Sequence, residues 1–190
     1  MEREKANATV EEIFSLYEKF GREDYIGEPV SQIEHMCQAA QLAEEDGFDH
    51  EVILAAFFHD IGHLLEHIMP VQQMDGYGIV NHETLAGEYL KQKGFSEKIA
   101  KLAESHVNAK RYLTYKLPEY YNKLSSASKI TLHKQGGSMD EMEAGLFEAD
   151  HLHQLYIKVR EWDDKAKVKN VPLPDLSKYK KMALDHLLSN

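Results

Sequence analysis

The chain is poor in cysteine, in basic charge and in long apolar runs. Cys37 is the single cysteine of the 190 residues, which excludes an internal disulfide and a cysteine-based zinc site. The 32 acidic residues outnumber the 22 basic ones, and the net charge of −10 argues against a general nucleic-acid or anionic-membrane surface. No apolar run is long enough to span a bilayer, and Met1–Thr9 lacks an apolar signal core. We therefore expect a cytoplasmic protein in a reducing compartment.

Length and composition favour one globular domain. Hydrophobic residues make up 43% of the chain and charged residues 28%, which is typical of a soluble globular protein with a sizeable core. We expect no nucleic-acid, membrane or obligate protein partner. A local cationic pocket for a small anionic substrate is compatible with the acidic balance.

The hydrophobic pattern predicts helices throughout, and no segment has the alternation typical of strands. Capping residues, glycine and proline bound the predicted helices at Val10–Phe20, Gln32–Asp46, His50–His59, His82–Lys93, Ser96–Ala109, Pro118–Leu124, Ser126–Lys134, Ser138–Glu148, Asp150–Lys167 and Lys178–Leu188. Leu64–Ile79 contains Pro70, Gly76 and Gly78 and is expected to form a loop over the site. The predicted fold class is all-α, a single-domain bundle with a metal-site core over about residues 25–165 and terminal helices over about 8–20 and 178–188 packed on it.

The central motif of the sequence is the stretch Phe57–His63. It follows the apolar run Val52–Ala56 and places His59 and Asp60 at the end of a buried segment. A buried carboxylate is costly unless it is paired or bound to a metal. A carboxylate that bridges two metal ions would be neutralised, and we expect this of Asp60.

The other candidate ligands lie on separate predicted helices, a common way for a helical bundle to build a metal centre. His35, His59, His82 and His106 recur at intervals of 24, 23 and 24 residues, and Asp163 or Asp164 adds a late carboxylate. This donor set suits iron, manganese or zinc better than magnesium, and it exceeds what one tetrahedral ion needs. Any one of these histidines alone would more often be a surface or core residue.

A second arrangement is less favoured. His59, His63 and His67 repeat at four-residue spacing and would share one face of a continuous helix. Gly62 and the loop that follows argue against that continuity.

The pattern resembles the HD-domain superfamily, helical proteins that bind metals through His, His-Asp and a distant Asp. Further motifs resemble the HD-type mixed-valent di-iron oxygenases that cleave the carbon–phosphorus bond of 1-hydroxyphosphonates, with myo-inositol oxygenase as a distant relative. These motifs are Asp24–Glu28, Gln32–His35, His106–Leu113, Leu124–Ser128, Gln135–Gly137 and Arg160–Asp164. The resemblance covers about Tyr25 to Asp164 and implies an HD-domain helical bundle.

The resemblance also implies the cofactor and its ligands. It implies two iron ions, a mixed-valent Fe(II)/Fe(III) pair, with O2 as cosubstrate. It assigns one iron to His35, His59, Asp60 and Asp163, and the other to Asp60, His82 and His106. Asp163 rather than Asp164 is implied because it lies three residues after Arg160.

Further residues take their roles from the same resemblance. Tyr25, near Glu28, would gate the open iron until substrate displaces it. The phosphonate would contact His63, Lys110, Ser128 and Arg160. The sequence spacing agrees with these phosphonate-binding roles. Lys110 lies one helical turn after His106 and Arg160 one turn before Asp163, so both cations share a helix face with a metal ligand. A phosphonate favours such cationic donors.

The amine end of the substrate is predicted from residue chemistry, because cations are held by carboxylates and aromatic faces. The candidates are Glu28, Glu66, Asp75 and Tyr77, with Met69 and Met74 as soft walls. They favour (R)-1-hydroxy-2-(trimethylammonio)ethylphosphonate, with 2-amino-1-hydroxyethylphosphonate as the other substrate and with phosphate plus glycine betaine or glycine as products. Two alternatives are an HD-type phosphohydrolase of nucleotides or phosphate esters, which would use a metal-activated water, and a non-catalytic HD module.

Overall fold

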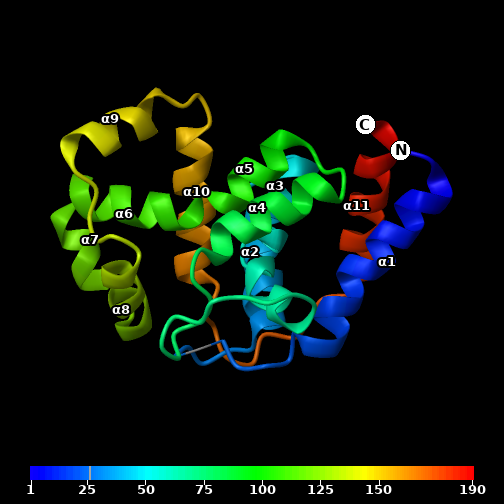
Figure 1. Ribbon diagram of the computed structural model, residues 1–190, viewed down its shortest axis with the longest axis horizontal. Helices are drawn as coiled ribbons and strands as arrows, with labels where there is room; N and C mark the ends of the chain where they lie inside the picture. Colours follow the sequence, from blue (N-terminus) through cyan, green and yellow to red (C-terminus); the bar gives the residue numbers. More distant parts are fainter. Residues whose placement is uncertain (26) are drawn as a thin grey trace.

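The computed structural model describes residues 1–25 and 27–190, and over these residues the fold is all-α, as the sequence predicted (Figure 1). Isolated bridges pair Asp24 with Ser31 and Gln73 with Ile79. The helices are α1 (Arg3–Phe20), α2 (Gln32–Glu45), α3 (His50–Phe58), the 3-10 helix η1 (Ile61–His67), α4 (His82–Gln92), α5 (Glu97–Glu104), α6 (His106–Lys116), α7 (Pro118–Lys123), α8 (Ser126–Lys134), α9 (Glu141–Ala149), α10 (His153–Lys165) and α11 (Ser177–Ser189).

Helix α3 is the centre of the core. Every residue from Val52 to Phe58 is buried, as expected for a helix that is apolar on all sides. The Asp49 side chain caps its first turn by accepting from the Val52 backbone N–H at 3.0 Å. Helices α2, α5, α10 and α11 pack around α3. Because α3 ends at Phe58, the next two residues, His59 and Asp60, are delivered to the interior, where both side chains are buried.

Helices α2 and α10 lie side by side next to α3 (Figure 1). They bring together His35 and Asp163, the first and last predicted metal ligands in the sequence. A capping box fixes the start of α2, where Ser31 and Glu34 exchange side-chain and backbone hydrogen bonds. This places His35 in the first turns of α2. Helix α10 carries Asp163 on its buried face, and Trp162 beside it is a core residue.

Several predicted boundaries were wrong. Helix α1 begins at Arg3 rather than Val10, α10 begins at His153 rather than Asp150, and η1 occupies the start of the predicted Leu64–Ile79 loop. The helix predicted over Ser96–Ala109 is two helices, α5 and α6, that meet at Ser105. The Ser105 hydroxyl donates to the Leu102 carbonyl at 2.7 Å, and such back-bonding bends helices.

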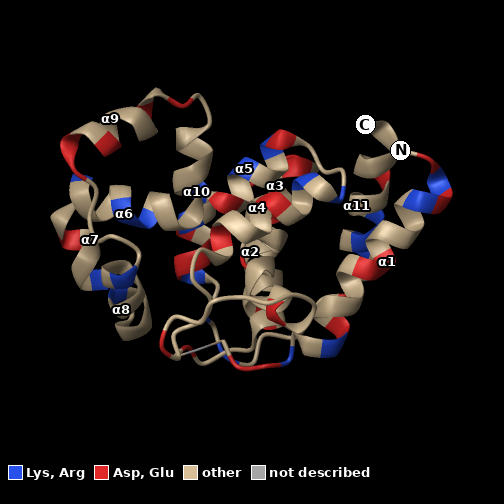
Figure 2. Ribbon diagram, viewed as in Figure 1, with Lys and Arg blue, Asp and Glu red and all other residues tan. Residues whose placement is uncertain are grey.

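The terminal helices α1 and α11 pack on each other, and α11 also packs on α3. The two chain ends lie close together (Figure 1), and the Met1 amino group donates to the Asn190 carbonyl at 3.2 Å. Acidic and basic residues are interspersed over the helices seen in Figure 2. Cys37 is buried. None of the helices in the described residues combines the length and apolar character that a bilayer crossing requires.

Candidate metal centre

His35 and His59 face each other across the first half of the site. Their Nε2 atoms lie 3.0 Å apart. The Nδ1 atom of His35 is 2.8 Å from the Ala166 carbonyl, and that of His59 is 2.8 Å from the Ala56 carbonyl. Since a carbonyl only accepts, each Nδ1 carries the proton and each Nε2 presents a lone pair to the other ring. Two facing lone pairs need a cation between them.

His82 and His106 repeat this arrangement in the second half. Their Nε2 atoms are also 3.0 Å apart. Nδ1 of His106 is 3.0 Å from the Ala103 carbonyl, and Nδ1 of His82 is 3.3 Å from the Ile79 carbonyl. The helix break at Ser105 contributes here, because it makes His106 the first residue of α6 rather than one near the end of a longer helix.

Asp60 lies between the two histidine pairs and is only 1% exposed. Its Oδ2 is 3.4 Å from His35 Nε2 and 3.3 Å from His59 Nε2. Its Oδ1 is 3.4 Å from His82 Nε2 and 3.3 Å from His106 Nε2. Neither oxygen has a hydrogen-bond partner, so each is placed to bind one ion of a pair. Burial alone would raise the pKa of Asp60, but the surrounding imidazoles hold it well below its ordinary value.

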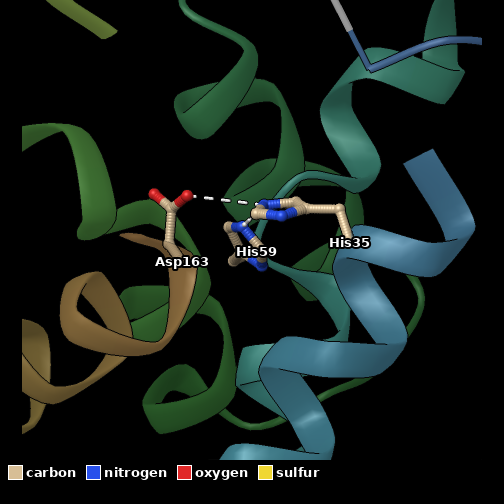
Figure 3. A group of neighbouring side chains, drawn as sticks. All are labelled: His35, His59 and Asp163. Atoms are coloured by element: carbon tan, nitrogen blue, oxygen red, sulfur yellow. Dashed lines mark hydrogen bonds and ion pairs between the residues drawn. The ribbon is translucent and has the colours of Figure 1, made fainter. Parts of the chain in front are cut away.

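Asp163 completes the first half from α10 (Figure 3). Its Oδ1 is 3.4 Å from His35 Nε2 and has no hydrogen-bond partner, whereas its Oδ2 accepts from Arg160 at 2.6 Å. Asp164 instead pairs with Arg160 and Tyr120. The geometry therefore favours Asp163 over Asp164 as a ligand.

The donor atoms form two buried groups, each compact enough to hold one ion. Within each group the donor atoms lie within 4.8 Å of one another, and the groups are His35, His59 and Asp163, and Asp60, His82 and His106. The buried carboxylate oxygens without partners and the facing imidazoles fit metal cations, and imidazole with carboxylate suits borderline metals such as iron. The alternative set is not brought together, because the His63 ring stacks on His82 at 4.0 Å and the His67 ring stacks on Phe20 at 3.8 Å.

A cavity of about 70 Å³ borders both groups, lined by His82 and His106 of the second and by Asp163 of the first. The lining residues that the sequence singled out for roles other than metal binding are Tyr25, Glu28, His63, Met74, Tyr77, Lys110, Ser128 and Arg160. The cavity thus joins both halves of the metal centre to the expected substrate residues.

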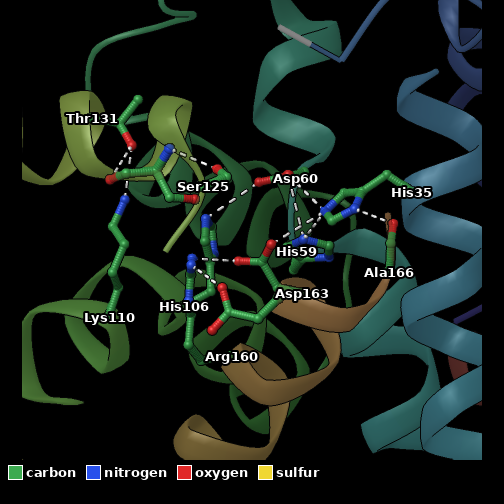
Figure 4. A network of polar contacts seen from close by, with 12 residues as sticks. His35, His59, Asp60, His106, Lys110, Ser125, Thr131, Arg160, Asp163 and Ala166 are labelled. Atoms are coloured by element: carbon green, nitrogen blue, oxygen red, sulfur yellow. Dashed lines mark hydrogen bonds and ion pairs between the residues drawn. The ribbon is translucent and has the colours of Figure 1, made fainter. Parts of the chain in front are cut away.

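Two buried cations border this cavity (Figure 4). Lys110 donates to the Thr131 hydroxyl at 2.9 Å. Burial, and then the neighbouring charge of Arg160, lower the pKa of Lys110 to about 7. Arg160 also donates from Nε to the Tyr120 hydroxyl at 2.9 Å. Both cations face away from bulk water, which strengthens their interaction with an anion.

Tyr25 and Glu28 lie at the other wall. The Tyr25 ring stacks on the His35 ring at 4.2 Å. Burial, and then the charges of Asp60 and Asp163, raise the pKa of Tyr25 well above its ordinary value. The Glu28 carboxylate accepts from the Ser125 hydroxyl at 2.6 Å and lies 2.9 Å from Lys167 Nζ. Ile26, within the same motif, lies outside the described residues.

Three residues predicted for the amine end lie away from the cavity lining. Glu66 is exposed, with its carboxylate 2.5 Å from the Gln73 amide nitrogen. Asp75 is exposed and pairs with Lys134, and Met69 is exposed. The 3-10 geometry of η1 turns Glu66 outward, which helical or loop spacing could not predict.

Three residues at the site escaped the sequence reasoning. Thr131 follows Ser128 by one turn of α8, so its position beside Lys110 could have been found from helical spacing. No sequence pattern predicts that Lys167 lies at the site, because it is 139 residues from its partner Glu28. None predicts that the Gln32 side chain lines the cavity, because a polar residue is common in the first turn of a helix.

Gly62 allows α4 to approach the HD segment closely. A Cβ atom at this position would lie 1.9 Å from the carbonyl oxygen of His82. We expect Gly62→Ala to displace His82, to lower the free energy of unfolding by about 1–3 kcal/mol and to weaken metal binding at the second group. Denaturant unfolding and metal titration measure both effects.

Gly145→Ala on α9 is the matched control, because nothing lies within 4 Å of its added Cβ. This change should raise stability by up to about 1 kcal/mol. Equal effects of the two substitutions would contradict the close approach at Gly62.

Comparison with known proteins identifies the family. The HD domain family matches residues 33–155. An uncharacterized protein, L432 of Acanthamoeba polyphaga mimivirus, is 46% identical over 94% of this chain and 81% of its own length. The [1-hydroxy-2-(trimethylamino)ethyl]phosphonate dioxygenase (glycine-betaine-forming) of Leisingera caerulea is 40% identical over 87% of this chain and 84% of its own. The hydroxymethylphosphonate dioxygenase of Gimesia maris is 38% identical over 90% and 84%. The chain belongs to the HD-domain family and, within it, to the group of enzymes that includes these hydroxyphosphonate dioxygenases.

Proposed function

We propose that the protein is a di-iron oxygenase that uses O2 to cleave the carbon–phosphorus bond of a 1-hydroxyphosphonate. The observation that carries this proposal is Asp60, whose two oxygens, free of hydrogen bonds, face two separate imidazole pairs. The cationic cavity beside one pair, and relatives that are dioxygenases of such substrates, support it.

The proposed reaction balances without another reductant. One 1-hydroxyphosphonate and one O2 give a carboxylic acid and phosphate, so that C1 is oxidised, its bond to phosphorus breaks and both O2 atoms enter the products. Two iron ions, in the mixed-valent Fe(II)/Fe(III) state, would supply dioxygen activation when held by the six ligands His35, His59, Asp60, His82, His106 and Asp163.

The remaining residues bind and orient the substrate. Lys110 and Arg160 offer buried positive charge to the phosphonate oxygens, and Ser128 and His63 line the same cavity and offer further donors. We assign Tyr25 the role of a gate, since its ring lies between the cavity and His35. Glu28, which shares the Tyr25 loop, holds that loop to Ser125.

The pKa of about 7 at Lys110 predicts a pH dependence of anion binding. Because this pKa is lowered, the ammonium form dominates below pH 7 and is lost as the pH rises through that value. Binding of inorganic phosphate, measured as product inhibition, should therefore weaken from pH 6 to pH 8 by about tenfold, the change expected for loss of one buried charge-assisted hydrogen bond.

In Lys110→Gln this decline should flatten, leaving the smaller dependence due to ionisation of phosphate itself. Lys129→Gln is the control, because Lys129 is a half-buried lysine of the same helix, α8, that does not line the cavity. Identical pH profiles for wild type and Lys110→Gln would contradict the assignment.

The function is tested by phosphate release from hydroxyphosphonates with and without O2. Purified, iron-loaded protein should release phosphate from at least one of hydroxymethylphosphonate, 2-amino-1-hydroxyethylphosphonate and the trimethylammonio compound, with one O2 consumed per phosphate. Release of phosphate from nucleotides or phosphate esters without O2, and none from the phosphonates, would instead establish the phosphohydrolase alternative.

A further inference from the structure

The charged and aromatic residues around the cavity bear on the chemistry of the group that the substrate carries at C1. A cationic substituent needs a free carboxylate or a free aromatic face. In the described residues, and apart from the metal ligands, two tyrosines that line the cavity have a carboxylate near them, which gives two sets: Tyr25 has Glu28, which also lines the cavity, and Tyr77 has the exposed Asp75, which lies outside the lining.

A lysine of the chain already occupies the first set. Lys167 Nζ lies 2.9 Å from Glu28 Oε1 and 6.0 Å from the centre of the Tyr25 ring. Both partners are shielded from water, with side chains 14% exposed for Lys167 and 8% for Glu28. Ser125 donates to the same carboxylate oxygen at 2.6 Å. Glu28 is therefore neutralised from behind the cavity wall.

A second lysine occupies the other set in the same way. Lys134 Nζ lies 2.6 Å from Asp75 Oδ2 and 6.0 Å from the centre of the Tyr77 ring. This pair is more exposed than the first and is screened by solvent. Its lysine still places positive charge beside Tyr77, which lies in the loop between η1 and α4 and lines the cavity.

Two side-chain amide oxygens at the cavity remain without a hydrogen-bond partner, and they can accept hydrogen bonds from uncharged groups. The side-chain oxygens of Gln32 and Gln135 are buried without a hydrogen-bond partner, and both residues line the cavity. An amide oxygen accepts an O–H or N–H hydrogen bond but offers no net charge. Water or a hydroxyl group on the substrate would satisfy both.

We infer that the preferred substrate is a small 1-hydroxyphosphonate whose C1 substituent carries no positive charge, and that Lys167, with Lys134, discriminates against ammonium groups. A substrate ammonium would meet like charge at both of its available subsites, in a cavity of about 70 Å³. This inference rests on the proposed function and differs from the trimethylammonio substrate that residue chemistry alone favoured.

The test compares kcat/KM for phosphate release from hydroxymethylphosphonate, 2-amino-1-hydroxyethylphosphonate and the trimethylammonio compound. Wild-type protein should favour hydroxymethylphosphonate over both cationic compounds by at least about tenfold, the ratio given by about 1.4 kcal/mol. Lys167→Met leaves the Glu28 charge unpaired, so it should shift this ratio toward the cationic compounds by about tenfold. The Lys167→Met/Glu28→Gln double variant removes both charges and should restore the wild-type ratio.

Lys165→Met is the matched control, since Lys165 is exposed and two residues away, and its ratio should equal that of wild type. A wild-type preference for either cationic compound, or an unchanged ratio in Lys167→Met, overturns the inference but does not contradict the proposed oxygenase function. Release of phosphate from none of the three compounds overturns the proposed function itself, and the inference with it.

Discussion

Asp60→Asn is expected to abolish the binding of both metal ions together. The amide has nearly the same shape as the carboxylate, but it lacks the negative charge and the second acceptor oxygen that a bridge requires. Asp60 faces all four site imidazoles at 3.3–3.4 Å, so both groups lose their shared ligand. Loss of outer partners of metal ligands typically costs about 10–100-fold in affinity or activity, and loss of the bridge should exceed that range.

Metal content per chain, measured after gel filtration, reports this effect directly, and circular dichroism tests whether the variant is folded. Asp185→Asn is the control, because Asp185 is an exposed residue of α11 paired with Lys181. Retention of two ions per chain by Asp60→Asn would contradict the bridging role.

Arg160→Met is expected to destabilise the metal-free protein by about 3–5 kcal/mol, the cost of breaking a buried ion pair by removing one partner. Arg160 is 3% exposed. Its guanidinium donates to Asp163 at 2.6 Å and also to Asp164. Without it, the buried Asp163 carboxylate loses its strongest partner. Burial alone raises the pKa of Asp163, and the Arg160 charge is what holds it well below its ordinary value.

Urea unfolding of the metal-free proteins measures this cost. Arg22→Met is the control, because Arg22 is exposed, and a surface charge change of this kind is expected to stay within about 0.5 kcal/mol. A loss no larger than that in Arg160→Met would mean that the cation is not needed to hold Asp163 in place. Added metal should recover part of the loss in Arg160→Met, because an ion at the first group neutralises the same carboxylate.

The sequence could predict the fold class and the metal-binding constellation because both follow from local pattern. The apolar segment before His59 and Asp60 can only be buried, and the acid that ends it needs a counter-charge. The histidine-bearing helices begin or end at recognisable signals, such as the capping box at Ser31. Of the residues predicted to surround the site, those spaced by a helical turn from a ligand, such as Lys110, line the cavity.

The parts that the sequence could not predict depend on geometry or on distant pairs. The bend at Ser105 comes from one hydroxyl that competes for a helix carbonyl, a choice that tertiary packing decides. The outward position of Glu66 follows from the tighter turn of η1. The pairing of Lys167 with Glu28 links residues 139 positions apart, and it changes the expected chemistry of the cavity because it neutralises the carboxylate that seemed available to an amine.

Metal analysis combined with Mössbauer spectroscopy, with and without hydroxymethylphosphonate, tests the central claim most directly. We predict two iron ions per chain in distinct environments, since a bridging Asp60 leaves Asp163 as an additional carboxylate at one ion, whereas both imidazoles of the other ion, His82 and His106, line the cavity. Substrate should perturb mainly the signal of the iron at His82 and His106. One iron or none per chain after anaerobic iron loading, or spectra unchanged by any of the hydroxyphosphonates, would contradict the two-iron oxygenase.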